Sequence, residues 1–580
     1  MSRDPDVVVV GAGADGPALA WALGKLGISV LVLEAGPWHG HANWPRPHQG
    51  PGSTSGSSSP EKLSSELLES QFTGREYEMN NVFSGKFRWG PADRRRAPWF
   101  RVEEEGGMTL QVAGVGGTTL HYFGNHPRAY PYAFREQDDW PIGYEELVPY
   151  YQLLEKHLPV KPAPTTPKDE VFYQGCRKAG WDLLDGKNIT GPGYRPMPNA
   201  VLQPDDQLSS SGPKSYRFPD VTGSTLTVNE YQGDALPRGA PVALKSKRSS
   251  NVAFIPQALA TGNVTVQPNS FVTNVLTDDS GAAGVEYRNT WTDEKELIQC
   301  DNVVLAGGCV ETPRLWLKSD LPDSDEVGRG LTTHWLDFVS GTFSSDTLNN
   351  LIDQSKLKPY TGQSGSARLD FPGLGAVAVN SFHPGITAGT LYGFSQKGIN
   401  EDSRNSSWDS VGKLAGSALK RKMAKYENTL TLIIHTDDRP HPDNRVTLDP
   451  NLEDKYGQIP RVNWSPHEQD SAKRTRLAEL GSEVLRAAGA ESVHRSYSAP
   501  IQLHLQSSMR MGAVTDETCE ARSVNGLFIA DHSVLPNSLG GPNPTHTGQA
   551  LALRTAGHIA DKYFPDRVSI EELLEEFNVK

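Results

Sequence analysis

Residues 6–37 read DVVVVGAGADGPALAWALGKLGISVLVLEAGP, the pattern of a strand, a tight turn, a helix and a second strand. The run Val7–Val10 is apolar and β-branched, which is typical of a buried parallel strand. Residues 18–26 have the composition of a helix, and residues 29–33 are apolar again. The stretch therefore predicts a βαβ unit at the start of an α/β fold.

The turn of this unit carries Gly11, Gly13 and Gly16 at the GxGxxG spacing. The first glycine permits the turn, the second lets backbone approach a pyrophosphate, and the third lets the helix pack on the strand. Glu34 follows at close to the ~20 residues expected of a dinucleotide unit, where it would accept hydrogen bonds from the adenosine ribose. The motif predicts a dinucleotide site and leaves NAD and FAD both open. Asp15 is unexpected beside phosphates, so we expect it to point away from them or to cap the helix.

Composition and charge exclude several other classes of protein. The chain has 580 residues, of which 22% are charged and 37% hydrophobic, and its net charge of −13 argues against nucleic acid as a partner. Its four cysteines form no CxxC pair, so neither zinc nor an iron–sulfur cluster is implied. The N-terminus enters the first strand at once and no long apolar run follows, so we expect no signal peptide, no membrane span and a cytoplasmic location.

The α/β pattern resumes twice, far along the chain. Strands are predicted at residues 263–267 and 301–305, and a last strand at 526–530 precedes a helix at 548–563. Between these segments the pattern alternates as in an antiparallel sheet, with predicted strands at 367–371, 376–382, 429–435 and 445–448 and a helix at 467–488. The sequence therefore predicts two interleaved domains.

Several further motifs occur in a fixed order: VGGTTLHYFG (115–124), DWPIGYEELVPYY (139–151), LAGGCVETPRL (305–315), PDNRVTLD (442–449), HLQSSMRMG (504–512), GLFIADHSVLP (526–536) and GGPNPTHTGQALALRTA (540–556). With GAGADG and Glu34, they resemble the glucose–methanol–choline (GMC) family of FAD oxidoreductases. Within it, the chain is most similar to the branch of the pyranose oxidases and the flavin subunits of gluconate-type dehydrogenases. The resemblance implies FAD as the cofactor.

The resemblance also implies a division of the chain. A Rossmann-like FAD-binding domain would comprise residues 1–135, 236–320 and 501–568. A substrate-binding domain, built on a mostly antiparallel sheet with helices, would comprise residues 136–235 and 321–500, and residues 569–580 would form a C-terminal helix. The substrate would lie between the two domains, where pockets are common.

The reaction implied is oxidation of a CH–OH group of a sugar, glycoside or related polyol to a carbonyl, with hydride transfer to flavin N5. His504 matches the family's catalytic histidine and would take the hydroxyl proton. Asn543 matches the second active-site position and would donate to the alkoxide. His546 departs from the apolar residue usual in relatives; it either packs beneath the start of the helix or adds a second imidazole near the flavin.

Further cofactor contacts are implied by position. Gly116, Gly117 and Thr118 would lie along the flavin, Val272 would offer backbone to adenine, and Asp531 would face the pyrophosphate and ribityl chain. His121 matches the histidine that carries the flavin covalently in pyranose oxidases; it either forms that bond or packs near the ring.

Other functions stay open at this point. The substrate is a sugar or a non-sugar alcohol of choline or sterol type, and the electron acceptor is oxygen, a quinone or another compound. A flavin-containing lyase of the same family and a flavoprotein without catalysis are the alternatives from other classes. The sequence does not determine the oligomeric state.

Overall fold

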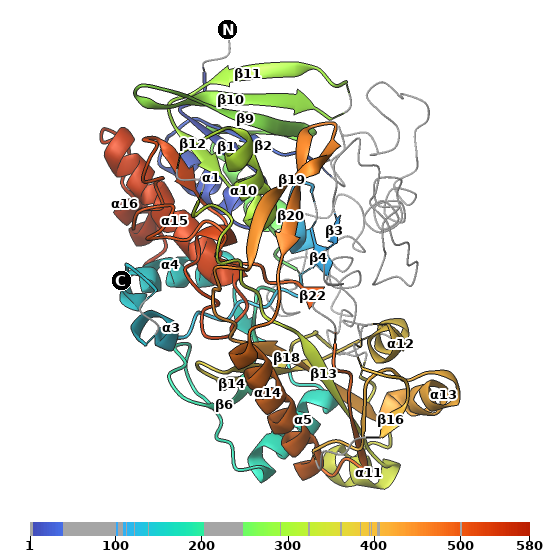
Figure 1. Cartoon of the computed structure of the whole chain (residues 1–580). Helices are drawn as coiled ribbons and strands as arrows, with labels where there is room; N and C mark the ends of the chain where they lie inside the picture. The colour runs from blue at the N-terminus through green and yellow to red at the C-terminus, as the bar shows by residue number, and fades with distance from the viewer. Residues whose placement is uncertain are drawn as a thin grey trace, which may run out of the picture.

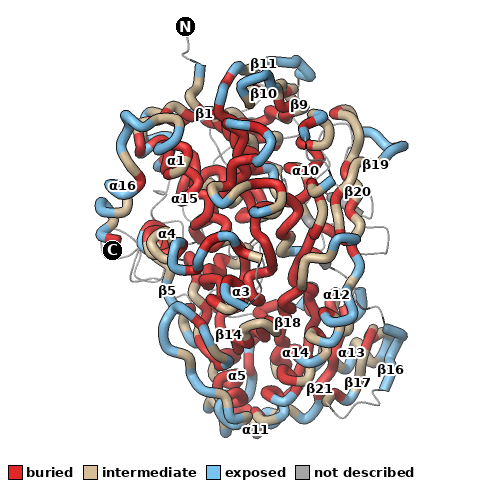
Figure 2. The backbone as a smooth tube through the Cα atoms, turned by 60° about the vertical axis from the view of Figure 1, so that its left-hand side comes forward, coloured by how far each residue is buried: buried red, intermediate tan, exposed pale blue. Residues whose placement is uncertain are grey.

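Two sheets, one in each half of the molecule, organise the computed structural model (Figure 1). Buried backbone runs through the middle of both halves, and exposed segments gather at the periphery, as at α16 (Ile570–Glu576), α11 (Ser345–Ile352) and β16 (Glu401–Asp402) (Figure 2). The structure describes residues 4–36, 38, 100–102, 108–111, 113–120, 122–136, 139–201, 247–290, 292–322, 325–359, 362–382, 384–393, 395, 397–402, 407–498 and 501–579.

The first sheet has five strands, all parallel, in the order β23-β12-β1-β2-β8. Strand β1 lies at its centre because its four valines are buried or nearly so, and Val8 pairs with both Leu31 and Val303. This sheet is the Rossmann-like unit that the opening stretch predicts. Its strands are β1 (Val7–Val10), β2 (Val30–Leu33), β8 (Val264–Gln267), β12 (Val303–Leu305) and β23 (Leu527–Ile529).

Helices from both ends of the chain cover the parallel sheet. Helix α1 packs against α15 and α9, and α15 also packs against α4. Their buried residues join the sheet in one large hydrophobic core. The helices are α1 (Gly16–Lys25), α4 (Tyr144–His157), α8 (Ser250–Ala253), α9 (Ile255–Ala260), α10 (Gly308–Lys318), α15 (Thr545–Tyr563) and α16 (Ile570–Glu576).

The second sheet has eight strands in the order β16-β17-β21-β13-β18-β15-β14-β6, antiparallel except where β17 meets β21. Helix α14 (Glu468–Ala487) packs on its central strands and on α5 (Pro167–Lys178), which also contacts α11 (Ser345–Ile352). The strands are β6 (Gly193–Pro196), β13 (Asp337–Thr342), β14 (Ala367–Phe371), β15 (Gly375–Asn380), β16 (Glu401–Asp402), β17 (Ser410–Val411), β18 (Thr429–Thr436) and β21 (Ser492–Arg495). The predicted fold class, a parallel nucleotide-binding sheet interleaved with a mostly antiparallel sheet, is confirmed.

Side-chain alternation gives the eight-stranded sheet two different faces. Leu430, Leu432 and Ile434 of β18 belong to the hydrophobic core that α14 covers. Because successive side chains of a strand point to opposite faces, His435 of β18 and Arg368 of β14 lie on the other face. The sheet thus buries an apolar surface beneath its helices and turns polar groups to the side where the active-site candidates lie.

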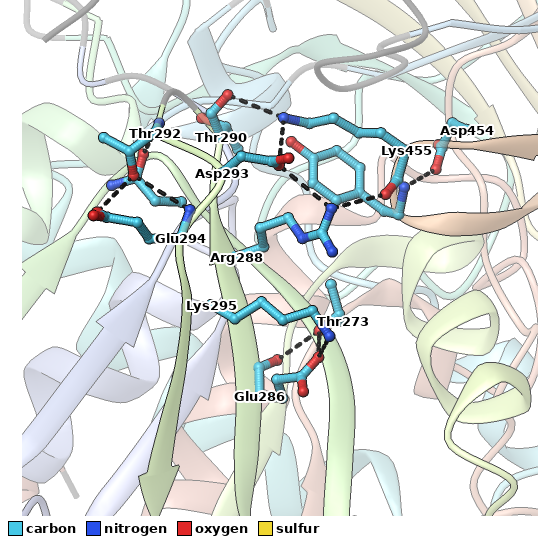
Figure 3. Close-up of polar contacts among 12 residues, drawn as sticks. Thr273, Glu286, Arg288, Thr290, Thr292, Asp293, Glu294, Lys295, Asp454 and Lys455 are labelled. Carbon is cyan, nitrogen blue, oxygen red and sulfur yellow. Dashed lines mark hydrogen bonds and ion pairs between the residues drawn. The ribbon is translucent and has the colours of Figure 1, made fainter.

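Two smaller sheets, a three-stranded meander and a two-stranded hairpin, contact each other. A meander of β9, β10 and β11 is joined to the β19–β20 hairpin by polar contacts: Lys455 Nζ lies 3.1 Å from Asp293 and donates to the Thr290 carbonyl at 3.3 Å (Figure 3). The Phe271 and Tyr456 rings stack beneath them, with centroids 4.0 Å apart. The strands are β9 (Ser270–Asp278), β10 (Gly281–Asn289), β11 (Lys295–Gln299), β19 (Arg445–Asp454) and β20 (Gly457–Asn463).

The remaining elements are short. They are β3 (Phe100–Val102), β4 (Met108–Leu110), η2 (Gly117–Leu120), α3 (Pro131–Arg135), β5 (Lys161–Pro162), β7 (Pro198–Asn199), α12 (Pro384–Tyr392), α13 (Gly416–Ala424), η5 (Tyr426–Asn428), β22 (Ile501–Gln502) and η6 (His532–Val534). The domain division stays a prediction, and its boundary at 235/236 falls outside the described residues. Within the described ranges, the helices are all too short or too polar to cross a membrane.

Leu432→Ala should destabilise the fold, because Leu432 is fully buried in the central strand β18. The truncation leaves a cavity, and we expect the free energy of unfolding to fall by about 2–5 kcal/mol. Leu297→Ala on β11, where the side chain is 58% exposed, is the matched control and should change it by less than about 0.5 kcal/mol. Equilibrium urea unfolding measures both, and equal losses in the two variants would contradict the assignment of the core.

Candidate active site

The glycine turn borders a cavity of about 130 Å³ at the carboxyl ends of β1, β2 and β12. Gly11 has φ +114°, and a Cβ there would lie 2.3 Å from the Ala306 carbonyl oxygen, so only glycine fits. A Cβ at Gly13 would meet no atom within 4 Å and would project into free space. Gly16 lies in the first turn of α1, where a Cβ would strike the Gly11 carbonyl oxygen. This bare backbone at a helix N-terminus is the shape that a pyrophosphate requires.

Glu34 lines the same cavity and holds three loops together. Its Oε2 accepts a hydrogen bond from the Ala12 amide at 2.8 Å. Its Oε1 accepts from the Gly36 amide at 2.8 Å and from the Gly114 amide at 2.9 Å. Burial raises the pKa of the carboxyl, while the three amides act in the opposite direction. A carboxylate offers about four acceptor positions, so one remains on Oε2 for a ribose hydroxyl. The cavity residues therefore fit a dinucleotide.

The predicted flavin-side loop packs against the glycine turn. The Gly116 amide donates to the Ala12 carbonyl at 2.7 Å, and a Cβ on Gly117 would lie 2.6 Å from the Gly13 Cα. Thr118 is exposed. Val272 lines the cavity. His121 lies outside the described residues, so its covalent bond to the flavin stays a prediction.

Two buried aspartates lie near the glycine turn. Asp531 follows β23, and its carboxylate accepts from the Gly308 amide at 2.8 Å and from the Thr312 hydroxyl at 2.6 Å. Asp15 is the N-cap residue of α1, but its side chain makes no capping hydrogen bond; its Oδ2 lies 3.3 Å from His532 Nε2. Burial opposes protonation of His532, but the Asp15 carboxylate raises its pKa above the ordinary value. The charge that seemed misplaced in the sequence is thus paired with an imidazole.

The predicted catalytic pair comes together from two distant segments. His504 lies just after β22 and Asn543 just before α15, and Asn543 Nδ2 is 3.3 Å from His504 Nε2. On the other side of the ring, His504 Nδ1 is 3.0 Å from His334 Nδ1. His435 completes a cluster, with its ring centroid 5.4 Å from that of His504 and 6.0 Å from that of His334. His504 is the partly exposed member; His334 and His435 are buried.

The cluster favours neutral imidazoles. Burial lowers the pKa of His334 to about 4 and that of His435 well below the ordinary 6.5. Burial, the neighbouring imidazoles and the positive charge of Arg368 lower the pKa of His504 well below 6.5. At neutral pH His504 is therefore neutral, and one of its ring nitrogens carries a lone pair, which a general base needs.

A buried ionic network supports Asn543 from behind. Arg368 Nη1 donates to Asn543 Oδ1 at 3.3 Å, and Arg368 Nη2 donates to the Tyr130 hydroxyl at 3.0 Å. Asp370 accepts from the Tyr130 hydroxyl and from Arg368 Nε, and from Arg195 Nε at 2.7 Å. The four side chains of this network, Arg368, Tyr130, Asp370 and Arg195, are all buried. Because Arg368 is held in this way, its contact with Oδ1 fixes the orientation of the Asn543 amide.

His546 lies apart from this pair, although it is only three residues beyond Asn543. Its Nδ1 is 2.9 Å from the His126 carbonyl oxygen, and its ring meets Tyr151 and His126 at centroid distances of 4.9 and 5.4 Å. The structure thus packs His546 beneath the start of α15, the first of its two predicted environments. Its catalytic role stays a prediction, and among the described residues its contacts are with His126 and Tyr151 instead of His504.

Sequence reasoning did not single out His334, His435 or Arg368. His435 is the last residue of the predicted strand 429–435, and Arg368 lies within the predicted strand 367–371. Alternation along these strands could have placed both residues on the polar face. His334 lies in a loop before β13 and has no local signal. Across the described part of the chain, no group of His, Cys, Asp or Glu has the geometry to hold a metal ion.

Comparison with known proteins agrees with this architecture. Two family models described as GMC oxidoreductase match residues 228–336 and 440–552. The chain is 26% identical to 2-methyl-1,2-propanediol dehydrogenase of Mycolicibacterium austroafricanum, over 96% of this chain and 95% of that protein. It is 25% identical to 6'''-hydroxyparomomycin C oxidase of Streptomyces lividus, over 97% of this chain and 93% of that protein.

A solved structure shares the fold. The crystal structure of pyridoxine 4-oxidase from Mesorbium loti superposes with a TM-score of 0.61 and 15% identity, covering 97% of this chain and all of that one. At this identity the likeness concerns the fold alone. The two family models, the relatives matched over nearly their whole length and the glycine turn with its cavity agree, and the chain is an FAD-dependent oxidoreductase similar to the GMC oxidoreductases.

Proposed function

We propose that this enzyme oxidises a CH–OH group of a sugar, glycoside or related polyol to a carbonyl, with His504 as the general base and Asn543 as a hydrogen-bond donor. The observation that carries the proposal is the 3.3 Å contact between His504 Nε2 and Asn543 Nδ2. A lone pair and an amide donor that face each other can both contact one hydroxyl oxygen, the first taking its proton and the second stabilising the charge that remains.

His504 suits this role in three respects. It is neutral at neutral pH because burial and nearby positive charge lower its pKa. It is partly exposed, so that a substrate hydroxyl can reach it. Its Nδ1 is held by His334, which fixes the plane of the ring. When FAD is bound, it supplies the acceptor for the hydride, which leaves the carbon that bears the substrate hydroxyl.

Asn543 would act without rearrangement during the reaction. Arg368 holds its carbonyl oxygen, so the amide NH₂ already faces the place where the alkoxide charge develops. A donor fixed in advance lowers the barrier because no energy is spent on turning it. Removal of one such donor typically costs about 10²–10³ in kcat.

The cofactor would lie along the carboxyl end of the parallel sheet. Gly11, Gly13 and Gly16 would hold its pyrophosphate and Glu34 its ribose, with Gly116, Gly117 and Thr118 along the flavin, Val272 at the adenine and Asp531 near the ribityl chain. The substrate would then lie on the side of the polar face of the eight-stranded sheet, as the predicted FAD-binding and substrate-binding domains require.

The substrate class rests on the relatives and on one polar group. The named relatives are a dehydrogenase of a small diol and an oxidase of an aminoglycoside. His435 Nδ1 is buried without a hydrogen-bond partner among the described residues, and a second substrate hydroxyl would satisfy it. A non-sugar diol is the second candidate, because the propanediol dehydrogenase matches nearly the whole chain.

Oxygen and a quinone are both candidate electron acceptors, since the two relatives are an oxidase and a dehydrogenase.

An anaerobic panel of sugars, glycosides and small diols tests the function. A true substrate should bleach the visible flavin band, and admission of oxygen or a quinone should restore it. His504→Asn should keep its FAD but slow the bleaching by about 10²–10⁴, the usual contribution of a general base.

Stopped-flow absorbance measures these rates, with His441→Asn as a control, because the His441 side chain is 36% exposed and lies 3.7 Å from Asp443. A flavin that no alcohol reduces would refute the proposal, as would bleaching at the normal rate in His504→Asn.

The pH dependence of kcat/KM should reflect the neutral state of His504. Because its pKa lies well below 6.5, kcat/KM should stay level as the pH falls through 6.5 and decline only further into acid. Protonation of the buried histidines also destabilises the fold below pH 6.5, so flavin circular dichroism is recorded in parallel. An acid limb at or above pH 6.5 in intact protein would contradict the lowered pKa of His504.

Gly13→Val should abolish FAD binding without unfolding the protein. The new side chain would occupy the free space at the glycine turn, and Gly13 has no positive φ that would strain the backbone. Gly191→Val is the matched control, since a Cβ there also meets no atom within 4 Å and the residue lies far from the turn in sequence. Flavin absorbance after gel filtration gives the bound fraction. Full FAD occupancy in Gly13→Val would show that the cofactor does not bind at the glycine turn.

A further inference from the structure

The contact between His504 and His334 joins two like atoms. Nδ1 of one ring lies 3.0 Å from Nδ1 of the other, within hydrogen-bond distance. In a neutral imidazole, one ring nitrogen carries a hydrogen and the other carries a lone pair. The contact is therefore a hydrogen bond only if one of the two Nδ1 atoms is protonated and the other is not.

A backbone carbonyl decides which atom carries the hydrogen. His334 Nε2 lies 3.1 Å from the Ser538 carbonyl oxygen, which can only accept, so Nε2 carries the hydrogen. Nδ1 of His334 is then the acceptor. Gln506 Nε2 is a more distant neighbour of His334 Nε2, at 3.4 Å, and its amide donates instead to the His504 carbonyl at 3.2 Å.

The same assignment follows independently from the opposite side of His504. Arg368 has only donors, so its 3.3 Å contact with Asn543 must be to the amide oxygen. The NH₂ of Asn543 consequently faces His504 Nε2, which must be the acceptor. Two separate chains of contacts, one from Ser538 and one from Arg368, therefore leave the hydrogen of His504 on Nδ1.

We propose that His334 is a positioning residue, which holds the general base His504 in the Nδ1–H tautomer and so keeps the lone pair on Nε2 for the substrate hydroxyl. The inference rests on the proposed function of His504. It adds that the base is prepared before substrate arrives and that a buried residue on another segment prepares it. Orientation of a catalytic histidine by the group bonded to its second nitrogen is a general device, and loss of the correct tautomer can cost several orders of magnitude in kcat.

Two substitutions separate the acceptor from the bulk of the ring. His334→Phe keeps an aromatic ring but removes the acceptor, and kcat should fall at least about tenfold with little change in KM. His334→Asn places a side-chain oxygen close to the position of Nδ1 and should recover most of that loss. His494→Phe is the matched control, because His494 is also buried in the eight-stranded sheet region and has a hydroxyl partner, Ser410, at 2.9 Å.

Nitrogen NMR of the holoenzyme labelled with ¹⁵N-histidine reads the tautomer directly. The His504 resonances are assigned by their loss in His504→Asn. We expect a protonated Nδ1 and an unprotonated Nε2 in the natural protein and in His334→Asn, and a mixed or reversed pattern in His334→Phe.

A protonated Nε2 in the natural protein would overturn the proposal, as would an unchanged tautomer and kcat in His334→Phe. The NMR result does not depend on turnover, so it remains readable if His504→Asn proves active. Activity in His504→Asn would refute the role of His504 as the base. The NMR pattern alone would decide whether His334 sets the tautomer of His504.

Discussion

The carboxylate of Asp370 lies fully buried at the junction between the two halves of the molecule, and the centre of the structure depends on how it is compensated. Arg195 and Arg368 lower its pKa despite the cost of burial, and the Tyr130 hydroxyl adds a third donor. Tyr130 belongs to a segment whose backbone amide donates to the Leu539 carbonyl at 3.2 Å. The buried Asp370 carboxylate therefore joins β14 to β6 and to the segment that carries Tyr130, and Tyr130 in turn contacts the loop that carries Leu539. Removal of a partner would leave the charge uncompensated.

The same junction holds the residues of the candidate site in place. His435 and Arg368 project from strands whose opposite face is packed beneath α14, so their backbone has little freedom to move. His504 and Asn543 come from loops, but each is held by a residue from another segment, His334 and Arg368. The loops themselves are constrained: a Cβ at Gly541 would lie 2.5 Å from the Gly375 Cα, and Leu539 is held at φ +63°. A scaffold of strands thus supports a candidate site in which His504 and Asn543 lie on loops.

The sequence predicts the parallel sheet well because its signals are local. Four valines, three glycines and one glutamate lie within about 30 residues, and each has a separate physical role. The resemblance adds the pairing of His504 with Asn543. Strand β13 was missed because DFVSGT shows no alternation, and it needs none, since both of its faces are buried. The contact of His334 with His504 spans 170 residues, and no local pattern reports such a distance. The partner of Asp15 was hidden for the same reason.

Strand β1 is complete within the first ten residues, yet its inner neighbour β12 comes at Val303–Leu305 and the edge strand β23 at Leu527–Ile529. Ribosomes add about 5–20 residues per second, so tens of seconds pass between the synthesis of β1 and that of β12. Throughout this interval the nascent chain presents one open, apolar strand edge, the kind of surface that promotes aggregation. A parallel sheet assembled from such distant segments is thus completed only after β23 has been synthesised, and until then β12 lacks a neighbour on one side.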